Sequence, residues 1–171
     1  MQENQIYRES IKGIEGKKIL QKGLNKSCNI VTSTMGARGS NNIFETQSRL
    51  PHVTSDGKDS LMQLFWVDPI ENLALQIVKE ACEKTFDVIG DGTTTTCALV
   101  QSFFNNSLEE LEKGGDAIEI KENIDKSVVK ILEYLDSIAV PLTPKLMFDV
   151  AKTSAHGDES IAKIIVEAFE K

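Results

Sequence analysis

The sequence has few residues of the kinds that build disulfide scaffolds or metal clusters. Its 171 residues include three cysteines, Cys28, Cys82 and Cys97, which lie far apart and form no C-x-x-C pattern. The two histidines, His52 and His156, are adjacent neither to each other nor to a cysteine, so a zinc site is not expected. An odd number of isolated cysteines fits a reducing compartment. We expect each of them to fill the core rather than to act as a nucleophile.

Long apolar runs and a broad basic surface are also lacking. No run reaches the roughly 18 residues that span a bilayer, and the N-terminus has no apolar stretch of signal-peptide length. We therefore expect no membrane segment and a cytoplasmic location. The formal net charge of −7 argues against nucleic-acid binding through a basic face. A hydrophobic content of 40% and a charged content of 26% fit a folded globular protein.

The sequence does contain a series of amphipathic segments, which predicts a mainly α-helical fold. The clearest helix begins at Asp68-Pro69, where an N-cap residue precedes a proline in the first turn. Gly13, Gly16 and Gly23 weaken the first predicted helix by about 1 kcal/mol each relative to alanine. Predicted helices cover about 11–34, 58–65, 69–89, 93–111, 116–138, 145–155 and 158–170. Short extended segments at 41–46 and 50–54 predict a small hairpin.

The run GDGTTTT at residues 90–96 carries the strongest functional signal, because it lies where one predicted helix ends and the next begins. Its glycines allow a sharp turn and a close approach of a ligand to the backbone. The free N–H groups and the dipole of the following helix suit an anion. The threonine hydroxyls can donate to phosphate oxygens, and Asp91 can hold a hard cation such as Mg²⁺. The run predicts a magnesium-phosphate cradle; the alternative is an Asp/Gly turn with threonine caps.

Two further turns, TMGARG at 34–39 and Ser55-Asp56-Gly57, place small residues or a carboxylate at the end of an element. Phosphoryl transfer needs a metal, donors to the phosphate oxygens and a carboxylate that orients the attacking water. Asp91 could hold the metal and Asp56 could orient the water. No G-x-x-x-x-G-K-[ST] is present, so the chain is not a P-loop protein. Taken alone, Asp56-Gly57 is an ordinary tight turn.

These three turns, in this order and at this spacing, resemble the nucleotide-binding half of the equatorial domain of a group I (GroEL-type) chaperonin. The resemblance extends to residues 124–126, to Val140-Pro141 and to TSAHGDE at 153–159, which resembles the start of the intermediate domain. It covers nearly the whole chain. It implies an equatorial-domain-like helical bundle with a small β-hairpin. Residues 1–141 would form the first half of the equatorial domain, and residues 142–171 would begin the intermediate domain.

The resemblance also implies that the chain binds ATP and Mg²⁺. Asp91 would coordinate the Mg²⁺, and Asp56 would be the catalytic residue that helps to organise the hydrolytic water. The hairpin between Asn42 and Thr54 would lie near a neighbouring subunit. The nucleotide-binding residues that the resemblance implies are Thr34, Met35, Gly36, Ala37, Ser55, Asp91, Gly92, Thr93, Thr94 and Thr95.

Two departures from the family pattern mark the sequence as a divergent member. Group I chaperonins usually have Pro-Lys-Gly in the first loop, where this chain has Ala37-Arg38-Gly39. They usually carry a lysine just before Asp-Gly, where this chain has Ser55. The loss of that ammonium group removes a candidate contact with the γ-phosphate.

A full chaperonin subunit continues into an apical domain and then returns to complete the equatorial domain. The returning segment carries the rest of the adenine pocket and a further catalytic aspartate, so we expect this 171-residue chain to be inactive as an ATPase by itself. In its full form, the resemblance implies an ATP-dependent folding chaperone in a homo-oligomeric ring, with unfolded client proteins and a co-chaperonin as partners. Two alternatives remain: a non-catalytic assembly or interaction module, and a small phosphate-binding protein that uses the GDGTTT helix start alone.

Overall fold

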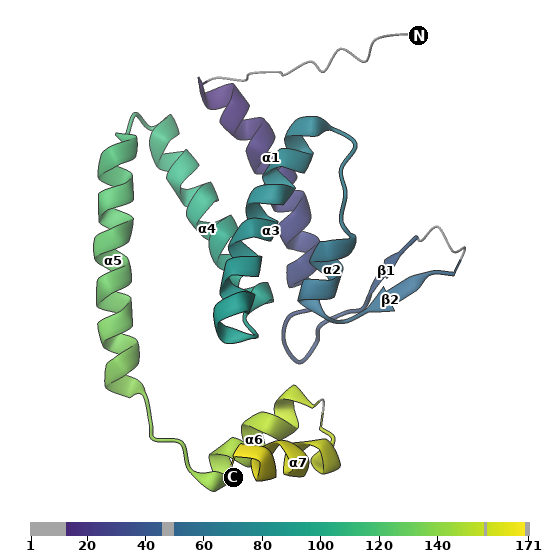
Figure 1. The fold of residues 1–171 in the computed structure, drawn as a ribbon. Helices are drawn as coiled ribbons and strands as arrows, with labels where there is room; N and C mark the ends of the chain where they lie inside the picture. The colour runs from purple at the N-terminus through teal and green to yellow at the C-terminus, as the bar shows by residue number, and fades with distance from the viewer. Residues whose placement is uncertain (1–12, 46–49, 156, 170–171) are drawn as a thin grey trace. The chain divides into compact units, whose positions relative to one another are not determined.

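A computed structural model describes residues 13–45, 50–155 and 157–169 of the chain. Within these residues the chain forms seven helices and one two-stranded hairpin (Figure 1). The elements are α1 (Gly13–Thr32), β1 (Asn42–Phe44), β2 (His52–Thr54), α2 (Gly57–Gln63), α3 (Pro69–Ile89), α4 (Thr93–Glu112), α5 (Ala117–Ile138), α6 (Pro144–Ser154) and α7 (Glu159–Phe169). The prediction of a mainly α fold with a small hairpin is confirmed, and the described ends agree with the predicted ones within two residues.

The chain divides into two compact units, Met1–Ile120 and Lys121–Lys171, which are described separately. Unit 1 holds α1 to α4 and the hairpin, and unit 2 holds α6, α7 and most of α5. The domain boundary at 141/142 refers to the domains of a full chaperonin subunit and stays a prediction. Among the described residues, no helix combines the length and the apolar character of a membrane span.

The core of unit 1 lies where α1, α3 and α4 pack against one another, with α2 beside them. Full burial of a leucine or valine side chain contributes about 1.5–3 kcal/mol, so this cluster supplies much of the stability of the unit. The expectation that the three cysteines fill the core is confirmed, since all three are buried. The buried residues are Leu24, Cys28, Val31, Leu61, Leu64, Ala74, Leu75, Val78, Cys82 and Cys97.

Gly23 explains why α1 contains a helix-weakening residue at its middle. A Cβ atom at this position would lie 2.6 Å from Cα and 2.8 Å from the carbonyl oxygen of Glu71 on α3. Contacts this short with backbone atoms cannot be relieved by a side-chain rotation, so the two helices can cross here only above a glycine. The lower helix propensity of Gly23 is therefore the cost of a close helix crossing.

The ends of α3 are set by local chemistry, as the sequence predicts. Asp68 is the N-cap, and its Oδ1 accepts hydrogen bonds from the N–H groups of Ile70 at 2.8 Å and Glu71 at 2.9 Å. Pro69 occupies the first turn, where its missing N–H has no cost. Gly90 ends the helix with φ 79°, in the left-handed region that glycine tolerates best.

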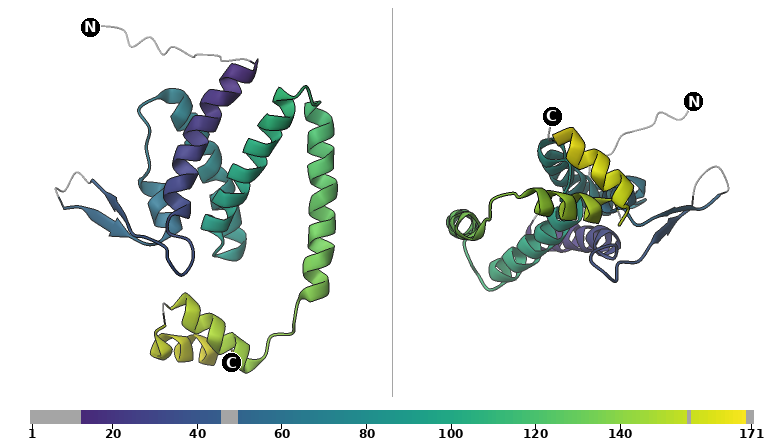
Figure 2. Two further views of the ribbon diagram at one scale, coloured as in Figure 1. Left: turned by 180° about the vertical axis from the view of Figure 1, so that it is seen from behind. Right: turned by 90° about the horizontal axis from the view of Figure 1, so that it is seen from below.

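The hairpin pairs β1 and β2 in an antiparallel register, with Asn42 opposite Thr54, Ile43 opposite Val53 and Phe44 opposite His52. Ile43 and Val53 share the exposed face of this pair. In both views of Figure 2 the hairpin projects from unit 1 next to the start of α2.

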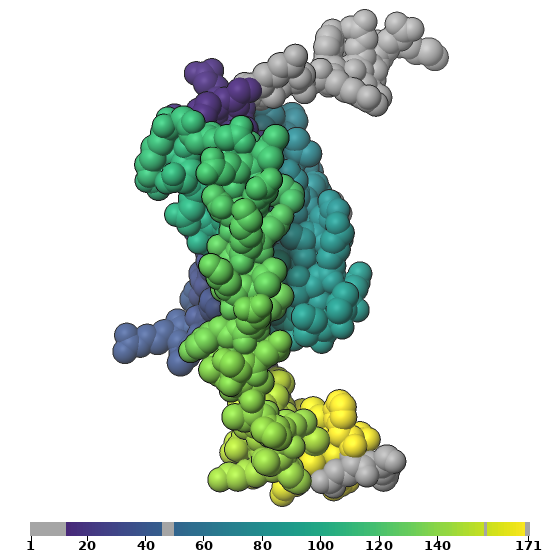
Figure 3. All heavy atoms as spheres, turned by 90° about the vertical axis from the view of Figure 1, so that its left-hand side faces the viewer, coloured from purple at the N-terminus to yellow at the C-terminus, as the bar shows by residue number. Residues whose placement is uncertain are grey.

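In unit 2, α6 and α7 pack against each other through the small buried residues Ala151 and Ala162. Thr143 is the N-cap of α6, and its Oγ1 accepts from the N–H of Leu146 at 3.2 Å. The space-filling view in Figure 3 looks onto α5, in green. This helix carries exposed apolar side chains, among them Val128, Leu132 and Leu135, at the helical spacing that the sequence shows.

Candidate functional site

The turn between α3 and α4 is built by two glycines on either side of Asp91. Gly90 has φ 79° and Gly92 has φ 86°, and both values favour glycine over any residue with a Cβ atom. The Asp91 side chain is exposed, and its Oδ1 accepts a hydrogen bond from the N–H of Gly92 at 2.6 Å. The turn thus presents a carboxylate to solvent at the start of a 20-residue helix.

Gly92, not a threonine, is the N-cap of α4, and this described helix start has no side-chain cap hydrogen bond. The alternative interpretation of Thr93 as a mere N-cap is therefore wrong. Because no side chain occupies the cap position, the first N–H groups of α4 are left for water or for a bound anion.

The threonines of the run have different surroundings. Thr93 is buried, and its carbonyl oxygen accepts a weak hydrogen bond from the Cys82 thiol at 3.6 Å. Thr96 stabilises the turn, since its Oγ1 donates to the carbonyl oxygen of Gly92 at 2.9 Å. Thr94 is half-buried and Thr95 is exposed. The hydroxyl of Thr95 is thus accessible to a ligand, whereas the hydroxyl of Thr96 is used within the protein.

The turn at 55–57 lies directly against the α3–α4 turn. A Cβ atom at Gly57 would lie 2.0 Å from Oγ1 of Thr94, so the backbone of α2 meets the threonine run where only a glycine fits. Asp56 is the exposed N-cap of α2, and its Oδ1 accepts from the N–H of Asp59 at 2.6 Å. Ser55, which precedes it, is also exposed. Gly57 and Gly92 are 35 residues apart in sequence. The two turns that contain them nevertheless share one surface.

The loop after α1 closes on itself and stands beside the same surface. Oγ1 of Thr34 donates to the carbonyl oxygen of Val31 at 2.8 Å, and the N–H of Gly39 donates to that of Gly36 at 2.9 Å. Val31 joins this loop to the second turn, because its Cγ1 would lie 3.4 Å from a Cβ at Gly57. Met35, Gly36 and Ala37 are exposed.

All three predicted turns thus lie at one end of unit 1 (Figures 1 and 2). Asn42, which the sequence analysis did not single out, links the parts that carry them. Its Nδ2 donates to the carbonyl oxygen of Ile30 at 2.9 Å and to Oγ of Ser60 at 3.0 Å. Its Oδ1 accepts from Oγ of Ser33 at 3.1 Å. One amide side chain therefore ties the end of α1 to the hairpin and to α2.

Lys58 is a second residue at this end that the sequence analysis did not identify. Its ammonium nitrogen lies 3.0 Å from the centroid of the Phe86 ring, which belongs to the last turn of α3. The lysine therefore reaches from the start of α2 toward the α3–α4 turn, held by a cation–π contact. Group I chaperonins usually have a lysine at the position of Ser55. A lysine only three residues later was therefore a sequence signal that could have identified Lys58.

The acidic groups of this end suit a cation only in company with a ligand. Among the described residues, no group of three or more histidine, cysteine or acidic side chains is arranged to hold a metal ion. Magnesium, however, is usually held by one or two carboxylates together with water and substrate phosphates. A single exposed carboxylate such as Asp91 fits that mode of binding.

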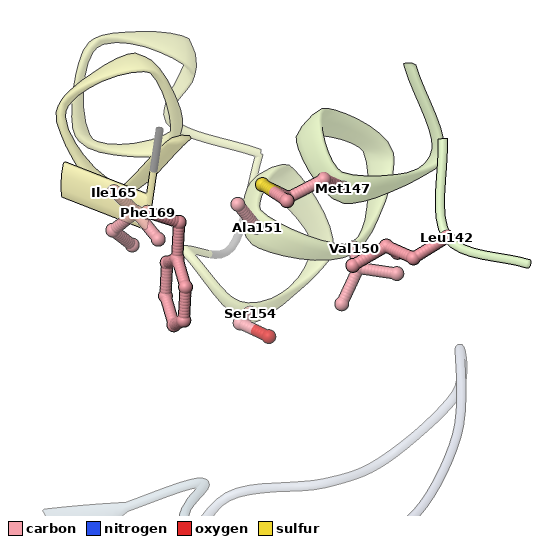
Figure 4. Close-up of a pocket in the computed structure, with 7 residues that line it drawn as sticks. All are labelled: Leu142, Met147, Val150, Ala151, Ser154, Ile165 and Phe169. Atoms are coloured by element: carbon pink, nitrogen blue, oxygen red, sulfur yellow. The ribbon is translucent and has the colours of Figure 1, made fainter. Parts of the chain in front are cut away.

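A separate apolar pocket of about 270 Å³ lies between α6 and α7 in unit 2 (Figure 4). Its lining offers one side-chain hydroxyl, that of Ser154, and otherwise hydrocarbon and thioether surface. The lining therefore has no charged or titratable side chain for acid–base chemistry. The lining residues are Leu142, Met147, Val150, Ala151, Ser154, Ile165 and Phe169.

Comparisons with known proteins agree with this fold. Among solved structures, the chaperonin gp146 from the bacteriophage EL 2 (Pseudomonas aeruginosa), crystallised in the presence of ATP-BeFx, matches with a TM-score of 0.77 and 27% identity. The match covers 92% of this chain and 28% of that one. A group III chaperonin in the open state matches with a TM-score of 0.77 at 19% identity, which shows likeness of fold alone. The mainly α, equatorial-domain-like fold is therefore confirmed.

The sequence comparisons identify the family. The mitochondrial chaperonin HSP60 of Trypanosoma cruzi is 37% identical over 161 residues, which cover 93% of this chain. The chain spans 28% of the length of that relative. The model of the TCP-1/cpn60 chaperonin family matches residues 28–171. The chain belongs to the TCP-1/cpn60 chaperonin family.

Proposed function

We propose that the chain is part of an ATP-dependent, protein-folding chaperonin subunit of the group I type, and that it binds Mg·ATP at the three turns of unit 1. The contact between Gly57 and Thr94 supports the proposal most directly. It brings the Asp-Gly turn and the threonine run together on one surface, although their sequence positions alone do not require it.

Each turn has a distinct task in this proposal. The free N–H groups of α4, with Gly92 to Thr95, hold phosphate oxygens at the positive end of the helix dipole. Asp91 binds the Mg²⁺, which neutralises the phosphates when bound. Asp56 orients the hydrolytic water, as a carboxylate beside a γ-phosphate does. Thr34, Met35, Gly36, Ala37 and Ser55 line the nucleotide.

Lys58 replaces the ammonium that is missing at Ser55. It stands at the start of α2, and its contact with Phe86 directs it toward the α3–α4 turn. The aromatic ring holds the long side chain in one place, so less rotamer freedom is lost when the ammonium meets a phosphate.

The activity of the whole protein, its partners and its location belong to the same proposal. They comprise a homo-oligomeric ring, unfolded client proteins, a co-chaperonin and a cytoplasmic location. The hairpin, with Ile43 and Val53 exposed on one face, lies near a neighbouring subunit in that ring.

Calorimetric titration of the chain with Mg·ATP tests the proposal. The variant Asp91→Ala is compared with Asp87→Ala, a matched control that removes an exposed carboxylate one turn earlier on α3. We expect Asp91→Ala to abolish binding and Asp87→Ala to retain it. Equal binding by the two variants would contradict the role of Asp91.

A folded chain that shows no binding in any of the three forms would favour the second candidate, a non-catalytic assembly module. The exposed apolar side chains along α5 are the observation that favours this candidate, since such surfaces often mark interfaces. Native mass then tests this second candidate by itself, because an assembly module forms oligomers without nucleotide and a folded monomer would contradict it.

A further inference from the structure

Three buried thiols in unit 1 have no part in the proposed nucleotide site. Cys28, Cys82 and Cys97 come from α1, α3 and α4, and each is at most 1% exposed. The sulfur atoms of Cys82 and Cys97 lie 3.3 Å apart. Three helices therefore contribute one sulfur each to a single cluster in the core.

The distance between Cys82 and Cys97 is short enough for bond formation after a small movement. A disulfide has an S–S length of about 2.05 Å, so the two sulfurs need to approach by about 1.3 Å from their present separation. Both residues belong to helices that are already in contact. The pair thus meets the main requirement for a crosslink, which is that the side chains face each other.

The two thiols also differ in acidity. The hydrogen bond from Cys97 lowers the pKa of Cys82 below its ordinary value. Hydrogen bonding with Cys28, and then with Cys82, raises the pKa of Cys97 far above its ordinary value. The thiolate is the form that reacts with oxidants, and the hydrogen bond with Cys97 favours that form at Cys82.

We propose that Cys82 and Cys97 form a redox-sensitive thiol pair, which hydrogen peroxide converts into a disulfide that joins α3 to α4 behind the 90–92 turn. The Cys82 thiolate attacks one peroxide oxygen, the O–O bond breaks, and hydroxide leaves with the sulfenic acid formed on Cys82. The Cys97 sulfur then attacks the Cys82 sulfur. The S–S bond forms, the S–O bond breaks, and the oxygen leaves as water with the Cys97 proton. The two thiols lose two electrons, which reduce the peroxide.

The position of the pair gives the crosslink a consequence for the candidate site. The Cys82 sulfur contacts the carbonyl oxygen of Thr93, the first residue of α4. A bond between Cys82 and Cys97 closes a loop that contains the whole GDGTT turn. Closing such a loop restricts the backbone within it, so backbone amides of residues 90–96 become harder to open.

Peptide mapping of the wild-type chain tests the proposal without any nucleotide. The folded protein is treated with hydrogen peroxide or with dithiothreitol, denatured, alkylated and analysed by mass spectrometry. We expect one intramolecular disulfide between the peptides that contain Cys82 and Cys97, a mass lower by two hydrogen atoms, and one alkylated cysteine, Cys28. Dithiothreitol reverses the change.

Cys28→Ala is the matched control, because it removes a neighbouring thiol and leaves the pair. It retains the crosslink, whereas Cys82→Ala and Cys97→Ala lose it. In the oxidised wild type, hydrogen exchange of residues 90–96 slows severalfold. The proposal would be overturned if all three thiols were still alkylated after peroxide, or if a sulfinic acid formed without a disulfide. It would also be overturned by a disulfide that involves Cys28 or that joins two molecules. Unchanged exchange at residues 90–96 would overturn the link to the turn. A failure of nucleotide binding affects the proposed function alone.

Discussion

The substitution Gly57→Ala tests the packing that brings two of the predicted turns together. The added methyl group would lie 2.0 Å from Oγ1 and 3.2 Å from Cβ of Thr94, and 3.4 Å from Cγ1 of Val31. The first distance is far below van der Waals contact. Since the Cβ atom of Thr94 is also close, rotation of its side chain relieves only part of the overlap.

Two opposing effects set the size of the change in unfolding free energy that Gly57→Ala causes. Replacing glycine with alanine reduces the freedom of the unfolded chain and, without a clash, stabilises by about 0.4–1 kcal/mol. Overpacking of a tight contact costs about 1–3 kcal/mol. Because the new methyl group overlaps both Oγ1 and Cβ of Thr94, we expect overpacking to outweigh the entropic gain. The net destabilisation should be about 1–2 kcal/mol. At about 2–4 °C per kcal/mol for a chain of this size, the unfolding temperature falls by roughly 2–8 °C.

Thermal unfolding followed by circular dichroism measures this effect in a double-mutant cycle. Thr94→Ala removes the oxygen that the new methyl group meets, so Gly57→Ala should destabilise less in the Thr94→Ala background than in the wild type. The coupling between the two sites is the quantity of interest. A Gly57→Ala variant at least as stable as the wild type, or the same loss in both backgrounds, would refute the contact and with it the shared surface.

Three further substitutions test other parts of unit 1. Gly23→Ala places a methyl group 2.6 Å from backbone of α3 and should cost about 3 kcal/mol in urea unfolding; a wild-type midpoint would disprove the close crossing. Lys22 and Lys26, at 2.6 Å and 3.2 Å, hold the pKa of Glu71 below its ordinary value of 4.5. The stability from this carboxylate is therefore full above that value and falls as pH drops through the lowered pKa. Glu71→Gln should flatten the plot of unfolding free energy against pH below about pH 4.5. The same slope in the variant and the wild type would count against the ion pairs. Lys58→Met should weaken Mg·ATP binding roughly tenfold in calorimetry, whereas equal affinity would remove Lys58 from the site.

The sequence predicted local features well because their physical causes are local. The start of α3 at Asp68-Pro69 and its end at Gly90 follow from a cap, a proline and a glycine, each of which acts within a few residues. The GDGTTT run predicted a helix start after a tight turn, and the structure has α4 beginning at Thr93. The burial of the cysteines followed from their apolar character and isolation.

The sequence interpretation was incomplete where two distant segments meet. Gly23 was identified as a weakness of α1, but the crossing with α3 that requires a glycine leaves no mark in the pattern of α1 alone. The position of the Lys58 ammonium group depends on the Phe86 ring, which is on another helix, so the sequence around Lys58 does not predict it. The roles of Asp56 and Asp91 in catalysis and metal binding stay predictions.

The sequence by itself determined which residues form helices, where those helices end, and the presence of three glycine-containing turns. Caps, periodicity and turn residues act over one or two helical turns, so a single sequence contains them in full. Only the tertiary structure decided that Gly57 lies against Thr94 and that the sulfurs of Cys82 and Cys97 face each other at 3.3 Å. Such contacts depend on how helices pack, and helix packing is fixed by the shapes of whole surfaces rather than by any short run of residues.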